Sequence, residues 1–290
     1  MIGEDFAPGF SSSTPHKIYS GTKSFVAVAA LLAERDGLLR LDEHAYETLP
    51  EWRNDGRREI TLNQLLSHTS GLGTGEEVIY PARDQLAAAV LVRLVDPPGT
   101  RFHYGPAGYQ AFGEILRRKL RPSGRSVEGY LRQRLFEPLD IDISSWKHDD
   151  AGQPLLHTGL QLSAREWAKF GEFVLAEEKS DKLGLGRSFP LLFKGHRANP
   201  AYGLGFWCNV PLPERAQPIA DLQPAMDGDQ LDPEGPGDLV AALGSGKQRL
   251  YVIPSLDLVI VRFGKEGAFS DGDFLSRLLT GRPQSDAHTH

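Results

Sequence analysis

The sequence predicts an α+β fold, in which an antiparallel sheet is flanked by helices and a mostly helical subdomain lies beside it. Helical patterns dominate the first two thirds of the chain, whereas short runs of β-branched and aromatic residues dominate after about residue 200. Helices followed by a meander of strands, instead of strands alternating with helices, indicate an antiparallel sheet. We therefore expect the C-terminal third to build most of this sheet.

The first predicted helix begins after Ser20. Residues 1–17 are rich in Ser, Pro and Gly and are typical of an extended lead-in. From there the residues are good helix formers, apolar on nearly every side, until Glu34 and Arg35, and Gly37 follows where helices commonly end. A helix that is apolar all round is buried.

The other helices are predicted from caps and breakers. Thr61 caps a short helix that stops near Gly71, and Pro97-Pro98-Gly99 ends an amphipathic helix over residues 84–95. Further helices are expected over residues 107–119, over about 126–135, from the Ser163 cap to Leu175, and over about 270–280.

Four short runs predict the strands of the sheet, and the link between the last two predicts how they pair. Pro254-Ser255 is a tight connection, so the strands on either side of it should form an antiparallel hairpin. The four runs are residues 202–207, 239–243, 249–253 and 256–261.

Composition bounds the partners of the chain. The 290 residues are 40% apolar and 24% charged, as in ordinary globular proteins, and the net charge of -6 argues against nucleic acid or an anionic membrane surface as a partner. No stretch approaches the roughly 18 apolar residues of a membrane span. The first five residues do not resemble a secretory signal, so we expect a chain that is soluble and unexported as written.

Two local features of composition also carry expectations. Cys208 is the single cysteine, which excludes an internal disulfide, and its apolar neighbours indicate a small core residue. The densest basic cluster is expected to form the solvated face and end of a helix. It comprises Arg117, Arg118, Lys119, Arg121 and Arg125.

The first turn of the buried helix carries a candidate nucleophile and base. Ser20 and Lys23 are three residues apart, so their side chains project from one face with roughly 5–6 Å between Cβ atoms. A serine hydroxyl needs a neighbour to take its proton, and burial favours the neutral lysine that can do so. Unpaired N–H groups at the helix start would stabilise an oxyanion. The alternative is a capping serine with a surface lysine.

Five ordered segments resemble one family. They are Ser20–Phe25 (SGTKSF), Leu65–Leu72 (LLSHTSGL), Gly99–Tyr104 (GTRFHY), Gly159–Ala164 (GLQLSA) and Tyr251–Val259 (YVIPSLDLV). In this order and spacing they are similar to the serine β-lactamase-like superfamily, in its branch of class C β-lactamases, D-alanyl-D-alanine carboxypeptidases and related esterases. The resemblance covers about residues 17–280 and implies a β-lactamase/transpeptidase-like fold.

The resemblance implies an acyl-enzyme mechanism. Ser20 would attack a carbonyl, Lys23 would act as base, and Tyr104 would pass a proton to the leaving group. The alternative for Tyr104 is an aromatic side chain packed beside Phe102.

Two motifs depart from the family pattern. Where the family has Tyr-x-Asn, this chain has Tyr104-Gly105-Pro106, so Pro106 offers a substrate amide no side-chain donor. The third motif is expected at Gly244-Ser245-Gly246-Lys247-Gln248, without a lysine at its head. Recognition of a substrate carboxylate would then need Lys247 or Arg249, while an N–H near residues 246–248 could join that of Ser20 in an oxyanion hole.

The resemblance also sets expectations for domain organisation. We expect one β-lactamase-related domain, with residues of about 1–48 and 155–290 in an α/β subdomain and about 49–154 in a helical subdomain. Family members usually place two strands ahead of the nucleophile helix, but 19 residues precede Ser20 here. This leads us to expect an open sheet edge or a native chain that starts upstream, in which case it would be periplasmic or secreted.

Other site types fit the sequence less well. Residues 244–247 resemble a phosphate-binding loop, but Ala241 and Gln248 stand where that motif needs Gly and Ser or Thr. The acidic run of Asp227, Asp229, Asp232 and Glu234 lacks calcium-loop spacing, so a solvated loop is expected. His68 resembles a buried structural histidine, and the other histidines, His103, His157 and His196, lack metal-ligand spacing. Neither a metal nor a cofactor is expected.

Two function hypotheses remain at this point. The first is a metal-independent serine hydrolase acting on a small ester or amide, with β-lactamase or penicillin-binding carboxypeptidase activity as its alternative. The second is an inert family member that binds a ligand or partner, which the departures at Pro106 and residues 244–248 would explain. The joint presence of Ser20, Lys23 and Tyr104 favours the hydrolase.

Overall fold

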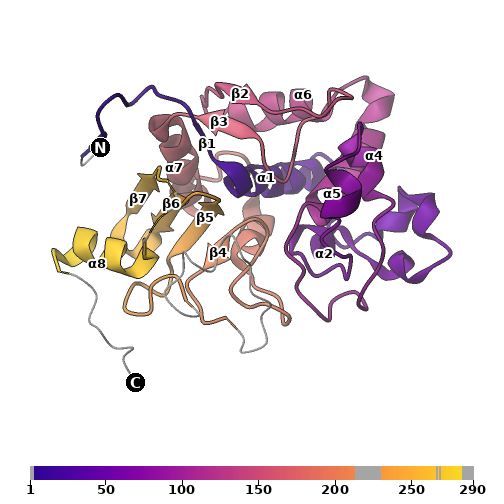
Figure 1. The fold of residues 1–290 in the computed structure, drawn as a ribbon. Helices are drawn as coiled ribbons and strands as arrows, with labels where there is room; N and C mark the ends of the chain where they lie inside the picture. The colour runs from indigo at the N-terminus through magenta and orange to yellow at the C-terminus, as the bar shows by residue number, and fades with distance from the viewer. Residues whose placement is uncertain (1–2, 213–229, 266, 268, 283–290) are drawn as a thin grey trace.

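The large sheet, the helical part and the small sheet meet around one central helix in the computed structural model, which describes residues 3–212, 230–265, 267 and 269–282. Helix α1 (Thr22–Arg35) crosses the middle of the molecule, with the strands β4–β7 on one side and the helices α2, α4 and α5 on the other (Figure 1). All of its residues from Thr22 to Ala33 are buried. The prediction of a buried helix after Ser20 is therefore confirmed.

The large sheet is antiparallel with strand order β4-β5-β6-β7. Its strands are β4 (Trp207–Cys208), β5 (Val240–Gly244), β6 (Gln248–Ile253) and β7 (Leu258–Arg262). The hairpin between β6 and β7, which turns at Pro254–Leu256, confirms the prediction made from Pro254-Ser255. Residues 202–206 are not a strand, because Tyr202 turns back to bridge Trp207.

Alternate residues of β6 face two different layers. Leu250 and Val252 point into the main core, on the side of α7 (Ala164–Ser180), whereas Tyr251 and Ile253 join a second apolar cluster. That cluster includes Leu275 of α8 (Asp271–Thr280). The sheet is thus covered by a helix on each face, as period-2 alternation of buried side chains requires.

A small antiparallel sheet, absent from the prediction, supports the start of α1. It has the order β1-β3-β2, formed by β1 (His16–Lys17), β3 (Leu160–Leu162) and β2 (Ser145–Trp146). Strands of two or three residues are too short to show alternation in a sequence. The N–H of Ile18 continues this pairing by donating to the carbonyl of Leu160 at 3.1 Å.

The helical part of the chain lies between α1 and the C-terminal strands in sequence. It contains α2 (Leu62–Leu66), α3 (Glu76–Ile79), α4 (Gln85–Ala89), α5 (Ala107–Leu120) and α6 (Val127–Leu131). The caps predicted at Thr61 and Ser163 accept hydrogen bonds from N–H groups three residues on, as expected.

Several predicted helix ends were wrong. The helix predicted over residues 84–95 ends at Ala89, because the carbonyl of Val90 is taken by the Nε1 of Trp52 and a guanidinium N–H of Arg57, both at 2.8 Å. Such donors come from distant parts of the chain and leave no local pattern. α2 ends at Leu66 instead of near Gly71, and α7 runs to Ser180 instead of Leu175. The helix predicted over about 126–135 is present, as α6 and a π-helical turn that continues it through Phe136.

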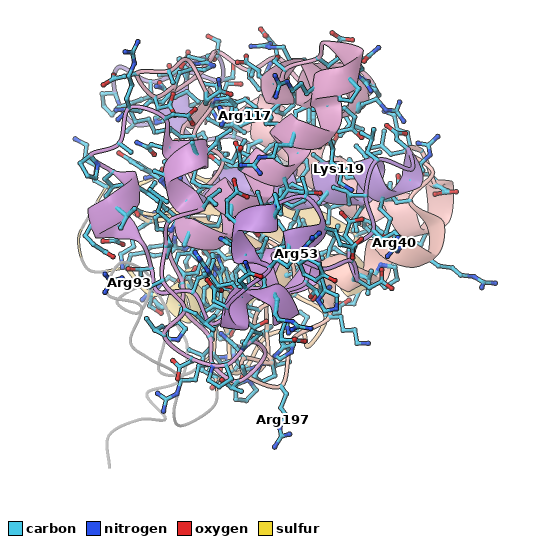
Figure 2. All side chains as sticks on the ribbon, turned by 90° about the vertical axis from the view of Figure 1, so that its right-hand side faces the viewer. Arg40, Arg53, Arg93, Arg117, Lys119 and Arg197 are labelled. Carbon is cyan, nitrogen blue, oxygen red and sulfur yellow. The ribbon has the colours of Figure 1, made fainter. Side chains whose placement is uncertain are left out.

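The basic cluster on α5 is less solvated than predicted. Arg118 pairs with Glu114 and Glu51, and Lys119 pairs with the buried Glu43 at 2.9 Å. Figure 2, which looks onto this side, shows labelled basic side chains spread from Arg93 to Arg40 and not gathered in one stripe. In the described residues, no helix has the length and apolar composition needed to cross a membrane.

The acidic run also differs from the expected solvated loop. Asp227 and Asp229 lie outside the described residues, but Asp232 is buried and its N–H donates to the side-chain oxygen of Asn209 at 2.9 Å. Cys208 is buried as predicted, and its thiol donates to the carbonyl of Phe193.

Candidate functional site

Ser20 lies in a tight 3-10 turn, Tyr19–Gly21, immediately before α1. Tyr19 has a φ of 47°, a left-handed conformation that costs energy for a bulky residue. The ring of Trp167 fills the space against Gly21, where an added Cβ would lie 2.7 Å from its Cζ2. The candidate nucleophile is half-buried on a turn that its neighbours fix in place.

Lys23 lies one helical turn further on and is directed at Ser20. Its Nζ is 3.2 Å from Ser20 Oγ and donates to the carbonyl of His157 at 2.9 Å. Among the described residues it forms no ion pair with a carboxylate. Complete burial without a compensating charge lowers the pKa of Lys23 from 10.5 to about 7. The amine is therefore neutral in a large fraction of molecules near neutral pH and able to accept a proton.

Tyr104 reaches the same point from the helical part of the molecule. The centroid of its ring is 4.5 Å from Lys23 Nζ. Rings of His68, Tyr202, Trp207 and Phe102 surround it, at centroid distances of 4.6, 6.0, 6.0 and 6.2 Å. Tyr104 is thus both a packed aromatic side chain beside Phe102 and a neighbour of the candidate base.

His68 is a buried histidine, as the sequence predicts, and its ring also contacts the ring of Tyr104 in the candidate site. Its carbonyl accepts from the N–H of His103 at 2.8 Å, and its φ of 57° turns the backbone sharply after α2. The ring is buried, and burial together with the charge of Lys23 holds the pKa of His68 well below its usual range. Its Nε2 is buried with no hydrogen-bond partner among the described residues.

His157 is a site residue that sequence reasoning missed. Its carbonyl is an acceptor for Lys23, and its buried ring stacks on the exposed Tyr80 at a centroid distance of 5.7 Å. Burial, and secondarily the charge of Lys23, also keeps the pKa of His157 well below normal. The contact uses a backbone carbonyl, which every residue has, at a position 134 residues away from Lys23. The sequence therefore contains no residue type that would predict it.

The β5–β6 turn, residues 244–248, packs against the nucleophile turn from the sheet side. A Cβ on Gly244 would overlap the carbonyl oxygen of Ile18, so only glycine permits this approach. Ser245 and Gly246 are half-buried, and in the described part of the chain their N–H groups meet no protein acceptor. Both residues follow the Gly244 that packs on the carbonyl of Ile18, two residues before Ser20.

Lys247 and Gln248 of the β5–β6 turn, and Arg249 after it, make hydrogen bonds within the protein. The Gln248 side chain donates to the carbonyls of Gly246 and Gly264, at 2.7 and 2.8 Å, and accepts from the N–H of Gly264. Lys247 is 7% exposed, with a φ of 63°. Arg249 is fully buried and paired with Asp271, so the expectation that it could receive a substrate carboxylate is wrong.

Pro106 is placed next to the site without a polar role. It is buried at the N-cap of α5, two residues after Tyr104, and it has no side-chain donor. The candidate nucleophile Ser20 and the candidate base Lys23 thus lie within hydrogen-bond distance, beside the β5–β6 turn. No group of three His, Cys, Asp or Glu side chains suited to a metal ion occurs within the residues that the structure describes.

Comparisons with known proteins identify the family of the chain. Residues 7–263 match the model of the Beta-lactamase family. Over 154 residues the chain is 31% identical to penicillin-binding protein 4 of Amycolatopsis lactamdurans, which is 49% of this chain and 37% of that protein. It is 28% identical over 170 residues to the acyltransferase mokF of Monascus pilosus, which is 48% of this chain and 40% of that one. These matches thus span about two fifths of each relative.

Solved structures give the same fold. EstCE1, described as a hydrolase with promiscuous acyltransferase activity, superposes with a TM-score of 0.64 at 16% identity, covering 90% of this chain and 83% of that one. Identity this low supports the fold alone. With the family match over most of its length, the chain belongs to the beta-lactamase family, as its motifs predicted.

Proposed function

We propose that this protein is a metal-independent serine hydrolase that acts on a small ester or amide through an acyl-enzyme, as carboxylesterases do. The observation that carries the proposal is the pair of Ser20 and Lys23, with Oγ and Nζ 3.2 Å apart and the amine buried with no carboxylate partner among the described residues. A neutral amine at hydrogen-bond distance is what a serine nucleophile requires.

In acylation, Ser20 Oγ would bond to the substrate carbonyl carbon while Lys23 Nζ takes the hydroxyl proton. The N–H groups of Ser20 and Ser245 would stabilise the tetrahedral oxyanion. As the bond to the leaving group breaks, Tyr104 would deliver the proton to the departing oxygen or nitrogen, drawing on the proton held by Lys23. The acyl-enzyme is then hydrolysed by water, which gives the carboxylic acid and restores Ser20.

Acyl transfer to an alcohol is a second fate of the same intermediate. The similarity to the acyltransferase mokF favours including it, because transfer and hydrolysis differ only in the molecule that attacks the acyl-enzyme. β-Lactamase or carboxypeptidase activity, for which the penicillin-binding relative is the argument, is the other alternative. Against it stand the engagement of Arg249 with Asp271 and the absence of an amide at Pro106.

The proposal also assigns roles to the two expected subdomains. Residues of about 1–48 and 155–290 would supply the nucleophile, base and oxyanion donors, and residues of about 49–154 would supply Tyr104. The substrate would bind where these parts meet, at the exposed end of the turn that carries Ser20.

Intact-mass analysis after treatment with a fluorophosphonate probe tests the proposal. We expect one adduct on the parent chain and none on Ser20→Ala or Lys23→Ala. Ser24→Ala is the matched control, because the Ser24 hydroxyl is buried and donates to the carbonyl of Gly205, so the adduct should persist. p-Nitrophenyl acetate, a chromogenic cephalosporin and an added alcohol then distinguish esterase, β-lactamase and acyltransferase.

An unlabelled but folded parent chain would refute the hydrolase proposal. The protein would then be better described as an inert family member that binds a ligand or partner. An adduct that survives in Ser20→Ala would place the nucleophile elsewhere.

A further inference from the structure

The β5–β6 turn beside Ser20 is held by its carbonyl oxygens. Of the five carbonyls in residues 244–248, four accept hydrogen bonds from side chains: those of Gly244, Gly246, Lys247 and Gln248. The donors are Arg249, Gln248 and Arg262. Side chains rarely supply so many bonds to one short turn, because most backbone groups pair with other backbone groups.

Arg249 makes the bond that matters most for the site. Its Nη1 donates to the carbonyls of Gly244 and Gln248 at 3.1 and 3.0 Å, while its Nε donates to Asp271 at 2.8 Å. Arg249 and Asp271 are both fully buried. The hydroxyl of Tyr251 also donates to Asp271, which begins α8. The guanidinium of Arg249 therefore connects the β5–β6 turn to Asp271 at the start of α8.

A fixed carbonyl fixes the next N–H. The peptide unit is planar and trans, so the C=O of one residue and the N–H of the next point in opposite directions. Holding the carbonyl of Gly244 therefore sets the direction of the N–H of Ser245. Ser245 is half-buried, its N–H has no acceptor within the described residues, and it adjoins the Gly244 that packs on Ile18, two residues before Ser20.

We propose that Arg249, locked by Asp271, is a positioning residue that preorganises the Ser245 N–H as an oxyanion donor. The inference rests on the proposed hydrolase function and deepens it. Oxyanion donors lower the barrier only if they are already aimed where negative charge develops. The ion pair between Arg249 and Asp271 does not itself require the additional hydrogen bond from Arg249 Nη1 to the carbonyl of Gly244.

The main test is Arg249→Lys, measured with p-nitrophenyl acetate. A lysine keeps a positive charge beside Asp271 but lacks the planar fork that reaches Asp271 and Gly244 together. We expect kcat to fall roughly 10- to 100-fold with KM changed less than about threefold, since removing one oxyanion donor outright costs about 10²–10³ in kcat. The pH at which activity is half-maximal should not move, because Lys23 is untouched.

A spectroscopic readout separates positioning from a general loss of structure. The carbonyl stretch of a ¹³C-labelled acyl-enzyme reports hydrogen bonds to that carbonyl, and we expect it to shift to higher frequency in Arg249→Lys. Arg57→Lys is the matched control. Arg57 likewise joins an aspartate, Asp55, to two carbonyls, those of Val90 and Val92, but it lies in the helical part. It should leave kcat and the stretch unchanged.

A double variant covers the case in which Arg249→Lys does not fold. Arg249→Met with Asp271→Leu replaces the buried pair by apolar side chains, a change that proteins often tolerate. A folded variant of either kind with parental kcat and an unshifted carbonyl stretch would overturn the positioning role and leave the hydrolase proposal intact. A parent chain whose Ser20 does not react would overturn both.

Discussion

The candidate site has two walls that are held in place by different interactions. The helical wall consists of Lys23 and the rings around it, and the sheet wall is the β5–β6 turn, residues 244–248. On the helical side, Lys23 faces aromatic rings, Tyr104 and Tyr109 among them, and the buried Nε2 of His68 beside these rings has no partner in the part of the chain that the structure describes. On the sheet side, the β5–β6 turn is held through nearly every carbonyl by side-chain hydrogen bonds. Ring packing dominates in the first wall, and side-chain hydrogen bonds dominate in the second.

The difference follows from what each wall would have to do. A lysine base must lose its charge, and apolar surroundings without a carboxylate achieve this. An oxyanion must be met by dipoles that do not reorient, and polar restraints on the backbone achieve that. The comparison predicts that the helical wall is sensitive to charge and the sheet wall to geometry.

Lys23→Met should have the largest effect on activity. The side chain keeps its approximate length but cannot accept a proton, so ester hydrolysis should fall by about 10³-fold or more. The rate of p-nitrophenyl acetate hydrolysis measures it, with Arg40→Met at an exposed surface position as control. Retention of a tenth of the activity would mean that another group is the base.

The same variant should be more stable than the parent. Lowering the pKa of Lys23 from 10.5 to about 7 destabilises the fold by on the order of 4 kcal/mol at pH 7, because the unfolded chain binds the proton more tightly. This cost is absent above pH 10.5, grows as pH falls and is complete below pH 7. Thermal unfolding at pH 7 should therefore show a higher Tm for Lys23→Met, and an unchanged or lower Tm would contradict this account of the helical wall.

Gly244→Ala should have the next largest effect, and it tests the sheet wall. The added methyl group would overlap the carbonyl oxygen of Ile18, which forces the β5–β6 turn away from Ser20. We expect kcat to fall about 10²-fold, comparable to losing an oxyanion donor. Gly237→Ala, where an added Cβ meets no atom within 4 Å and the φ is not positive, controls for loss of glycine. Equal activity of the two variants would show that the close approach is dispensable.

The pH dependence should report the helical wall alone. Since only neutral Lys23 accepts the proton, kcat/KM should rise about tenfold from pH 6 to pH 8 and then level off, with a midpoint near 7. Initial rates across pH 5 to 9 measure this. A midpoint below 6 or above 9 would show that the surroundings of Lys23 differ from those described.

The smallest effect is expected from His68→Phe, set against Gln248→Met. Both changes remove polar atoms from buried side chains, but His68 Nε2 has no partner in the described residues and the Gln248 amide makes three hydrogen bonds. His68→Phe should change kcat less than about threefold and unfolding free energy by less than about 1 kcal/mol. Gln248→Met should cost about 1–3 kcal/mol, because the backbone groups of Gly246 and Gly264 lose partners.

Urea unfolding of the two variants beside the parent gives the free energies. A destabilisation of His68→Phe as large as that of Gln248→Met would mean that the helical wall also depends on polar bonds.

Features that depend on neighbouring residues were predicted well. The helix after Ser20, the capping by Thr61 and Ser163 and the β6–β7 hairpin each follow from residues within a few positions of one another. The spacing of Ser20 and Lys23 belongs to this class, because a helix places residues three apart on one face.

Features that depend on distant contacts were missed or misread. The early end of α4 follows from Trp52 and Arg57, and the strands β1 and β2 exist only because β3 pairs with both. The sequence offers Arg249 as a residue that could bind a substrate carboxylate. In the structure its guanidinium is instead bound to the carboxylate of Asp271, 22 residues further on.

The sequence by itself therefore determined the family, the fold class and the helical turn that carries the candidate nucleophile and base, since these depend on local spacing and ordered motifs. Only the tertiary structure decided that Lys23 has no carboxylate partner among the described residues, that His157 offers it a carbonyl, and that Arg249 holds the turn next to Ser20. Burial and hydrogen-bond direction are set when distant segments pack together, so the order of residues along the chain does not predict them.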